Sequence, residues 1–409
     1  MLNFKTFLIE GGGNIVVKNV NSGKDQPDEV FSQPIDLTQH SRLNVQNDVR
    51  NFLHSVNNTH KNQFGSDLFG RNGESINTGT AFAGSTHHLF DSSISDKEHN
   101  QYKPSVGDID TMYKEENKPT LEKILTPGSK HGVYTIVGTK KYGSQMSAIV
   151  RHDNGEHHQI DFEPAKYEGN EPSDWNKFSH SSNWEDVKKG IKGSQHKMLL
   201  GSLTAAHGNV GIIRNKAGDQ DGFLENDTFS VDKGLRPRYQ SIGTDENDKS
   251  IVKELQPKDA TYTTNVPEIY EKLIGKPPSG DDLEKFGSFQ GLTGLIKKHL
   301  SPEQRSRVFD KYTSRLYGQN SQLLDSDFKK DELVKETALN HLRKNFPEHF
   351  TDEKNTELQD SKELFYKTNL ERKQAKAAKE AQTPQPTSEK PKPKSKSVPK
   401  DTSYGGRKI

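Results

Sequence analysis

Two aspartates separated by one isoleucine, Asp108-Ile109-Asp110, constrain this chain more than any other stretch of its sequence. Side chains alternate along a β-strand, so both carboxylates would lie on one face and Ile109 would enter a core on the other. Two carboxylates on one face repel each other unless a proton or a cation lies between them. Mg²⁺ suits such hard oxygen ligands. The alternative is a solvated acidic loop, so the question is whether the chain supplies the rest of a metal site.

A third acid follows on a second predicted strand. Asp153-Asn154-Gly155 predicts a hairpin turn, and residues 157–163 after it alternate between apolar and polar side chains. Asp161 would then face away from its two apolar neighbours, as the first pair does. Glu163 lies two residues further on the same face and is a second candidate ligand. The histidines of these segments are interpreted as ordinary strand or helix-start residues and not as zinc ligands: His87, His88, His157 and His158.

Two further segments carry groups that suit a phosphate. The apolar run 80–83 ends in Gly84-Ser85, which predicts a strand, a tight turn and the start of a helix. A glycine there lets backbone N–H groups approach a phosphate, and the serine hydroxyl adds a donor. Residues 183–205 predict a helix, a kink and a second helix, on which Lys197 is our candidate phosphate contact. An ordinary turn and a solvated basic helix face are the alternatives.

These parts, in this order over roughly residues 75–205, resemble the nucleotidyltransferase superfamily that includes DNA polymerase β. They also resemble nucleotidyltransferase-like proteins of T4-like phages. The resemblance implies a metal-dependent, pyrophosphate-releasing transfer of an NMP from an NTP to a hydroxyl acceptor. It assigns catalysis and the binding of two Mg²⁺ ions, with Mn²⁺ as a substitute, to Asp108, Asp110 and Asp161. It assigns nucleotide binding to Gly84, Ser85 and Lys197. The acceptor stays open among a protein, RNA, DNA and a small molecule.

The alternative is a catalytically inactive virion or interaction protein that keeps the nucleotidyltransferase fold. A long link, residues 86–107, separates Ser85 from Asp108, and its part 91–105 is polar and predicts a loop. Thr111 follows Asp110 where the family usually has an apolar residue. These two features favour the inactive protein, whereas the complete set of acids favours the enzyme.

The first residues carry a separate signal. Phe4, Phe7 and Leu8 have the spacing of a short amphipathic helix, which the triple glycine 11–13 would end. This start resembles the capsid-targeting sequences of T4-like phages, whose prohead protease cuts after a Leu/Ile-x-Glu triplet. Leu8-Ile9-Glu10 matches that triplet. The resemblance implies cleavage after Glu10, that protease as a partner, and a location in the phage virion interior or in the host cytoplasm. A short helix docked on the first domain is the alternative.

Composition limits the remaining choices. Only 29% of the 409 residues are hydrophobic and 28% are charged, with a mean hydropathy of -0.98, which predicts sizeable disordered segments. The 57 acidic and 58 basic residues nearly cancel, so net charge indicates no class of partner. The absence of cysteine excludes disulfides, thiol catalysis and cysteine-ligated zinc, and fits a reducing compartment. No stretch has the length and apolarity of a transmembrane helix, so we expect no membrane partner.

We therefore predict an α+β fold. A small mixed β-sheet nucleotidyltransferase domain with flanking helices would span residues 36–210, after the capsid-targeting segment 1–13. An irregular β-containing extension (211–265), a helical region (266–382) and a disordered basic tail (383–409) would follow. Within the first domain we expect a helix that Asp36 or Thr38 caps and that runs to about Lys61, followed by a loop over 64–79.

Overall fold

A computed structural model of the chain describes residues 16–18, 29–142, 145–207, 210–214, 220–230, 234–244, 250–255, 263–318, 321, 323 and 328–382. Packing divides the chain into two units, residues 1–362 and 363–409. The predicted capsid-targeting segment and the predicted basic tail lie outside the described residues. Within those residues, no helix combines the length and apolar character needed to cross a membrane.

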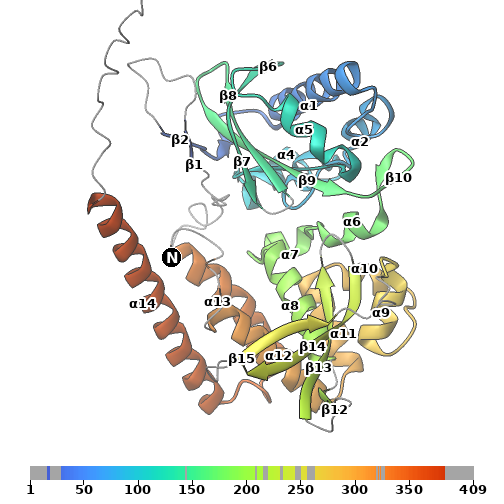
Figure 1. Ribbon diagram of the computed structural model, residues 1–409, viewed down its shortest axis with the longest axis vertical. Coiled ribbons are helices and arrows are strands. Elements are labelled where there is room, and N and C mark those ends of the chain that lie inside the picture. Colours follow the sequence, from blue (N-terminus) through green and yellow to red (C-terminus); the bar gives the residue numbers. More distant parts are fainter. Residues whose placement is uncertain are drawn as a thin grey trace, which may run out of the picture. The chain divides into compact units, whose positions relative to one another are not determined.

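A mixed five-stranded sheet organises the first part of the larger unit (Figure 1). Its strands, in spatial order, are β5 (Ile109–Lys114), β9 (His157–Ala165), β8 (Gln145–His152), β7 (Tyr134–Tyr142) and β6 (Lys130–His131). β5 runs parallel to β9, and the other neighbouring strands are antiparallel. The predicted turn at 153–155 joins β8 to β9. The sheet, together with the helices described below, confirms the predicted α+β class.

Helix α1 (Arg42–Phe64) packs on this sheet and supplies much of its core. Its buried apolar residues recur at helical spacing: Val45, Val49, Phe52, Leu53 and Val56. They share one core with Ile109 of β5 and with Ile160 and Phe162 of β9. α5 (Lys118–Ile124) contributes Leu121 and Ile124 to the same core and lies beside α1 (Figure 1). The acid-bearing strands are thus anchored from their apolar faces.

The predicted cap of α1 is wrong. Ser41 caps the helix, because its side chain accepts a hydrogen bond from the backbone N–H of Asn44. Asp36 instead belongs to β3 (Ile35–Asp36), which pairs with β4 (Ser105–Val106), and its carboxylate accepts from the N–H of Thr38 at 2.8 Å. The helix also continues past Lys61 and ends where Gly65 adopts a left-handed conformation with φ +77°.

Two predicted loops contain helical turns. Residues 64–79 hold the short helices η2 (Arg71–Gly73) and α2 (Glu74–Thr78). Residues 91–105 hold α4 (Asp96–Tyr102), whose first turn is capped by Ser95. Polar side chains of α4 make its contacts with Trp184. The His99 ring stacks on the Trp184 ring, and the indole N–H of Trp184 donates to Glu98 at 2.9 Å. Hydrophobic spacing cannot reveal a helix that is held by such contacts.

The segment 80–83 is not a strand. Only Phe82 forms a β-bridge, with Thr111 of β5, before the turn at Gly84-Ser85 leads into α3 (Thr86–Phe90). Asp108 also lies outside a strand, because β5 begins at Ile109. Asp108 therefore belongs to the link between β4 and β5, whereas Asp110 belongs to β5, so the two acids do not lie on one continuous strand.

The chain then becomes mainly helical. After the small hairpin β10 (Tyr167–Glu168) and β11 (Glu171–Pro172), three helices follow: α6 (Asp174–Ser179), α7 (Trp184–Lys188) and α8 (Gly193–Ala206). The predicted helix, kink and helix over 183–205 correspond to α7 and α8. An antiparallel four-stranded sheet comes next: β12 (Val210–Arg214), β13 (Gln220–Ser230), β14 (Gly234–Thr244) and β15 (Ser250–Leu255). A separate pair, β1 (Val16–Lys18) and β2 (Glu29–Phe31), precedes β3.

The predicted helical region is present. It consists of α9 (Val266–Ile274), α10 (Asp282–Phe286), α11 (Phe289–His299), α12 (Pro302–Tyr317), α13 (Phe328–Asn345) and α14 (Asp352–Gln382). α8 packs on α11 and α12. Asp186 of α7 accepts hydrogen bonds from the backbone N–H groups of Phe289 and Gln290 at the start of α11.

Candidate metal centre

Three carboxylates from two parts of the chain meet at one end of the paired strands β5 and β9. One oxygen from each of Asp108, Asp110 and Asp161 lies within 4.8 Å of the other two. Asp110 and Asp161 are direct partners in the parallel register of the two strands, and Asp108 lies just before β5. The three acids singled out in the sequence are therefore brought together by strand pairing.

Thr86 fixes the loop that carries the first two acids. Its fully buried hydroxyl accepts a hydrogen bond from the N–H of Asp110 at 2.9 Å and donates one to the carbonyl of Asp108 at 3.2 Å. The first residue of α3 thus joins the turn at Gly84-Ser85 directly to both halves of the Asp-x-Asp motif. No sequence pattern indicates this role of Thr86, because it depends on how the link 86–107 folds back.

Thr111 has a structural role of its own. Its buried hydroxyl donates to the carbonyl of Asp161 at 2.9 Å, which ties β5 to β9 next to the acids. An apolar residue at this position could not make that bond. Thr111 thus belongs to the framework of the site.

Two glutamine side chains orient Asp161. The amide of Gln145 donates to Oδ2 at 2.8 Å, and the amide of Gln159 donates to Oδ1 and Oδ2 at 3.0 and 2.9 Å. Gln159 precedes Asp161 by two residues, so strand alternation alone places it on the same face. Gln145 comes from the start of β8, and its contact requires the tertiary register. Three hydrogen bonds from these side-chain amides hold the Asp161 carboxylate in one orientation, as supporting contacts do around metal ligands.

The acids raise one another's affinity for protons. Burial, with the charges of Asp108, Glu163 and Asp161, raises the pKa of Asp110 well above its usual range, whereas the charge of Lys197 opposes this. Burial and the charge of Asp108 raise the pKa of Asp161 to about 7. Such repulsion is what a bound divalent cation would relieve.

Glu163 and Lys197 flank the three acids in different ways. Burial works to raise the pKa of Glu163, but contact with Nδ1 of His180 and the charges of His180 and Lys197 hold it below its usual range. Glu163 is thus paired with a histidine rather than grouped with the three close carboxylates. Lys197 on α8 is near enough to lower the pKa of both Asp110 and Glu163. The charge of Lys197, the predicted phosphate contact, therefore acts on the acids of the centre.

The turn at Gly84-Ser85 adjoins the centre. Gly84 has φ +54°, and a β-carbon added there would lie 2.6 Å from Oδ2 of Asp110. Its backbone N–H, however, donates to the carbonyl of His180 at 2.6 Å. The carbonyl of Ser85 accepts from the buried ammonium of Lys103 at 2.9 Å. The turn thus lies where the sequence placed it, but the Gly84 N–H already has a protein partner.

The donor set fits a hard divalent cation. Three carboxylates offer oxygen ligands only, the type that Mg²⁺ and Mn²⁺ bind, and one oxygen of each lies within 4.8 Å of the other two. Comparison with protein-family models, with curated proteins and with solved structures finds no match for this chain. Function must therefore be argued from the site.

Proposed function

We propose that this protein is a metal-dependent nucleotidyltransferase that transfers an NMP from an NTP to a hydroxyl acceptor and releases pyrophosphate. The observation that carries the proposal is the convergence of Asp108, Asp110 and Asp161 within 4.8 Å, beside a glycine turn packed against Asp110. Three clustered carboxylates are costly to a fold unless a cation uses them.

Each residue has a role in this proposal. Asp108, Asp110 and Asp161 would hold two Mg²⁺ ions, which would supply charge stabilisation to the triphosphate and activate the acceptor hydroxyl. Thr86 holds the backbone of Asp108 and Asp110, and Gln145 and Gln159 keep the Asp161 carboxylate oriented. Lys197 adds positive charge on the side of Asp110 and Glu163, where it would attract the triphosphate.

Labelled NTPs with Mg²⁺ and candidate protein, RNA, DNA and small-molecule acceptors test the proposal. We expect transfer or self-modification, seen as an added NMP mass, and a loss of at least about 100-fold in Asp108→Ala with Asp110→Ala. Asp153→Asn is the matched control, because Asp153 lies on the exposed turn between β8 and β9, where its carboxylate pairs with Lys130 of β6. Transfer that survives the double substitution would sink the catalytic assignment.

A second candidate is an inactive protein with the same fold. The hydrogen bond from the Gly84 N–H to His180 favours it, because a phosphate at this turn would first have to displace that carbonyl. Calorimetry with a non-hydrolysable NTP and Mn²⁺, together with the transfer assay, separates the two candidates. The enzyme binds both nucleotide and metal and transfers the NMP, whereas the inactive protein shows no transfer under any condition.

The proposal extends to the location of the protein. We place it inside a phage head, with delivery to the host cytoplasm, on the strength of the Leu8-Ile9-Glu10 triplet alone. Mass spectrometry of the protein from purified virions is expected to find Gly11 as its first residue. A chain that is absent from the particle, or that begins at Met1 there, would overturn this part.

A further inference from the structure

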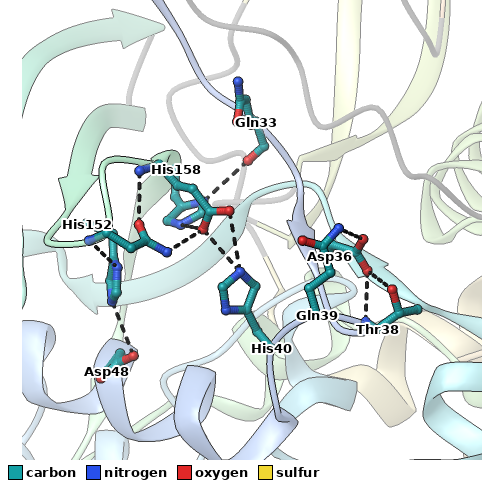
Figure 2. Close-up of polar contacts among 10 residues, drawn as sticks. Gln33, Asp36, Thr38, Gln39, His40, Asp48, His152 and His158 are labelled. Carbon is teal, nitrogen blue, oxygen red and sulfur yellow. Dashed lines mark hydrogen bonds and ion pairs between the residues drawn. The ribbon is translucent and has the colours of Figure 1, made fainter.

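Two imidazoles and one carboxylate, groups that can act as metal ligands, lie close together where β8 turns into β9 (Figure 2). His40 precedes α1, whereas Glu156 and His158 belong to the turn and the start of β9. Nε2 of His40 lies 3.2 Å from Oε2 of Glu156, and Nε2 of His158 lies 3.7 Å from the same oxygen. One carboxylate oxygen is therefore shared between two imidazoles from distant parts of the sequence.

The hydrogen bonds of His158 determine which ring nitrogen can bind a cation. Nδ1 of His158 lies 3.4 Å from the carbonyl of Gln33, and a carbonyl can only accept, so Nδ1 carries the proton. The Nε2 lone pair of the neutral ring then faces the Glu156 carboxylate, which is also an acceptor. A metal ion satisfies both acceptors.

Neighbouring contacts hold these groups as metal ligands are usually held. The amide of Asn154 donates to Oε2 of Glu156 at 2.8 Å, and its side-chain oxygen accepts from the Glu156 N–H at 2.9 Å. A histidine that donates its other nitrogen to a backbone carbonyl is a common arrangement around metals. His152 lies alongside and is bound separately, with Nδ1 accepting from the Asn154 N–H and Nε2 3.4 Å from Asp48 (Figure 2).

We propose that His40, Glu156 and His158 form a binding site for a transition-metal ion of the Zn²⁺ class. Two imidazoles and one carboxylate are a donor set that Zn²⁺, Co²⁺ and Ni²⁺ prefer and that Mg²⁺ does not. Tetrahedral zinc with ligands at 2.0–2.1 Å has ligand–ligand distances of about 3.3 Å, close to the 3.2 and 3.7 Å found here. Binding would clamp the segment before α1 onto β9.

The three ligands can reach one ion if the side chain of His40 moves. Within the part of the chain that the structure describes, the acid triad is the group whose ligand atoms all lie within 4.8 Å of one another. The His40 ring must therefore turn toward His158 when the ion enters. The side chain of His40 is 31% exposed, so solvent leaves room for that rotation, whereas His158 is 4% exposed and fixed.

Cobalt and zinc titrations of the metal-free full-length chain test the site. We expect one Co²⁺ with visible bands of tetrahedral intensity, displaced by Zn²⁺, and at least tenfold weaker binding in His40→Ala and in Glu156→Gln. His157→Ala is the matched control, because this ring points to the opposite face of β9. Asp108→Asn with Asp110→Asn separates the two metal sites and is expected to leave Co²⁺ binding here unchanged.

The lack of cysteine in the chain permits a direct test of coordination. His40→Cys places a thiolate where the imidazole was, and we expect a new near-ultraviolet sulfur-to-cobalt charge-transfer band. A band of this kind requires the residue to be a ligand, so a merely structural effect of the substitution cannot produce it. Tight binding that is unchanged in His40→Ala and Glu156→Gln, or the absence of the band together with an intact fold by circular dichroism, would overturn the proposal.

Discussion

Thr86 holds Asp110 by a hydrogen bond of 2.9 Å from the backbone N–H of the aspartate to the threonine hydroxyl, and the same hydroxyl donates to the carbonyl of Asp108. One buried side chain thus sets the distance between two candidate metal ligands. Because Thr86 directly follows the Gly84-Ser85 turn, it also makes the position of that turn depend on the Asp-x-Asp loop. This relationship leads to the first prediction.

Thr86→Val is expected to weaken Mn²⁺ binding at the acid triad and to lower the free energy of unfolding by about 1–3 kcal/mol, because the Asp110 N–H loses its buried partner. Thr86→Ser keeps the hydroxyl and should retain most of both properties. Calorimetry with Mn²⁺ and urea denaturation measure them. Thr204→Val is the control, since that buried hydroxyl only bonds to Leu200 in its own helix. Equal loss of Mn²⁺ affinity in Thr86→Val and Thr204→Val would contradict the assigned role.

Gly84→Ala is expected to cost more than its backbone strain. A left-handed conformation costs a non-glycine residue about 1–2 kcal/mol, and the added β-carbon would also lie 2.6 Å from the Asp110 carboxylate. Gly275→Ala measures the cost of the backbone strain alone, because Gly275 has φ +80° but open space around its β-carbon position. We expect metal affinity to fall only in Gly84→Ala. If calorimetry finds the two variants alike, contact between Gly84 and Asp110 is unimportant.

Acid should destabilise the fold through buried histidines. Burial lowers the pKa of His196, although the bond of its Nε2 to the Phe286 carbonyl opposes this, and burial likewise lowers the pKa of His131. The unfolded chain therefore binds more protons than the folded chain below about pH 6.5, so the free energy of unfolding falls as the pH falls through that window. Urea denaturation at pH 7.5 and 5.5 should show a smaller decrease in His196→Gln than in the wild type. His87→Gln, an exposed position, should leave the decrease unchanged, and an unaltered decrease in His196→Gln would refute the explanation.

A buried ion pair in α13 gives a prediction for the helical region. Nζ of Lys335 lies 3.0 Å from Oδ2 of Asp331, and both side chains are fully buried. Lys335→Met removes the cation from a buried carboxylate and should lower the free energy of unfolding by about 3–5 kcal/mol. Asp331→Leu combined with Lys335→Met should recover much of that loss, because no charge is then left in the core. Chemical denaturation of the two variants measures both values.

Exposed pairs provide the comparison for this prediction. Lys285 and Asp281 have the same helical spacing as the buried pair and lie 2.6 Å apart, but solvent surrounds them. Lys285→Met should therefore have a small effect, because water screens the interaction. A loss in Lys285→Met as large as that in Lys335→Met would show that burial is not the cause.

The sequence was sufficient for features that depend on local spacing. The alternation around Asp161 predicted β9, and the helical recurrence of Val45, Val49 and Phe52 predicted α1. The three acids could be chosen because carboxylates next to apolar strand residues are conspicuous. Gln159 could also have been found, since it lies two residues before Asp161 on the same face of the strand.

Tertiary structure alone decided how these pieces meet. The parallel register of β5 and β9 sets Asp110 opposite Asp161, and no local pattern encodes that register. α4 escaped prediction because it is held by Trp184, which lies more than eighty residues away, and Gln145, His180 and the grouping of His40 with Glu156 and His158 were missed for the same reason. Local periodicity reports which face of an element is buried, whereas a site depends on contacts between elements, and those are fixed only when the chain packs.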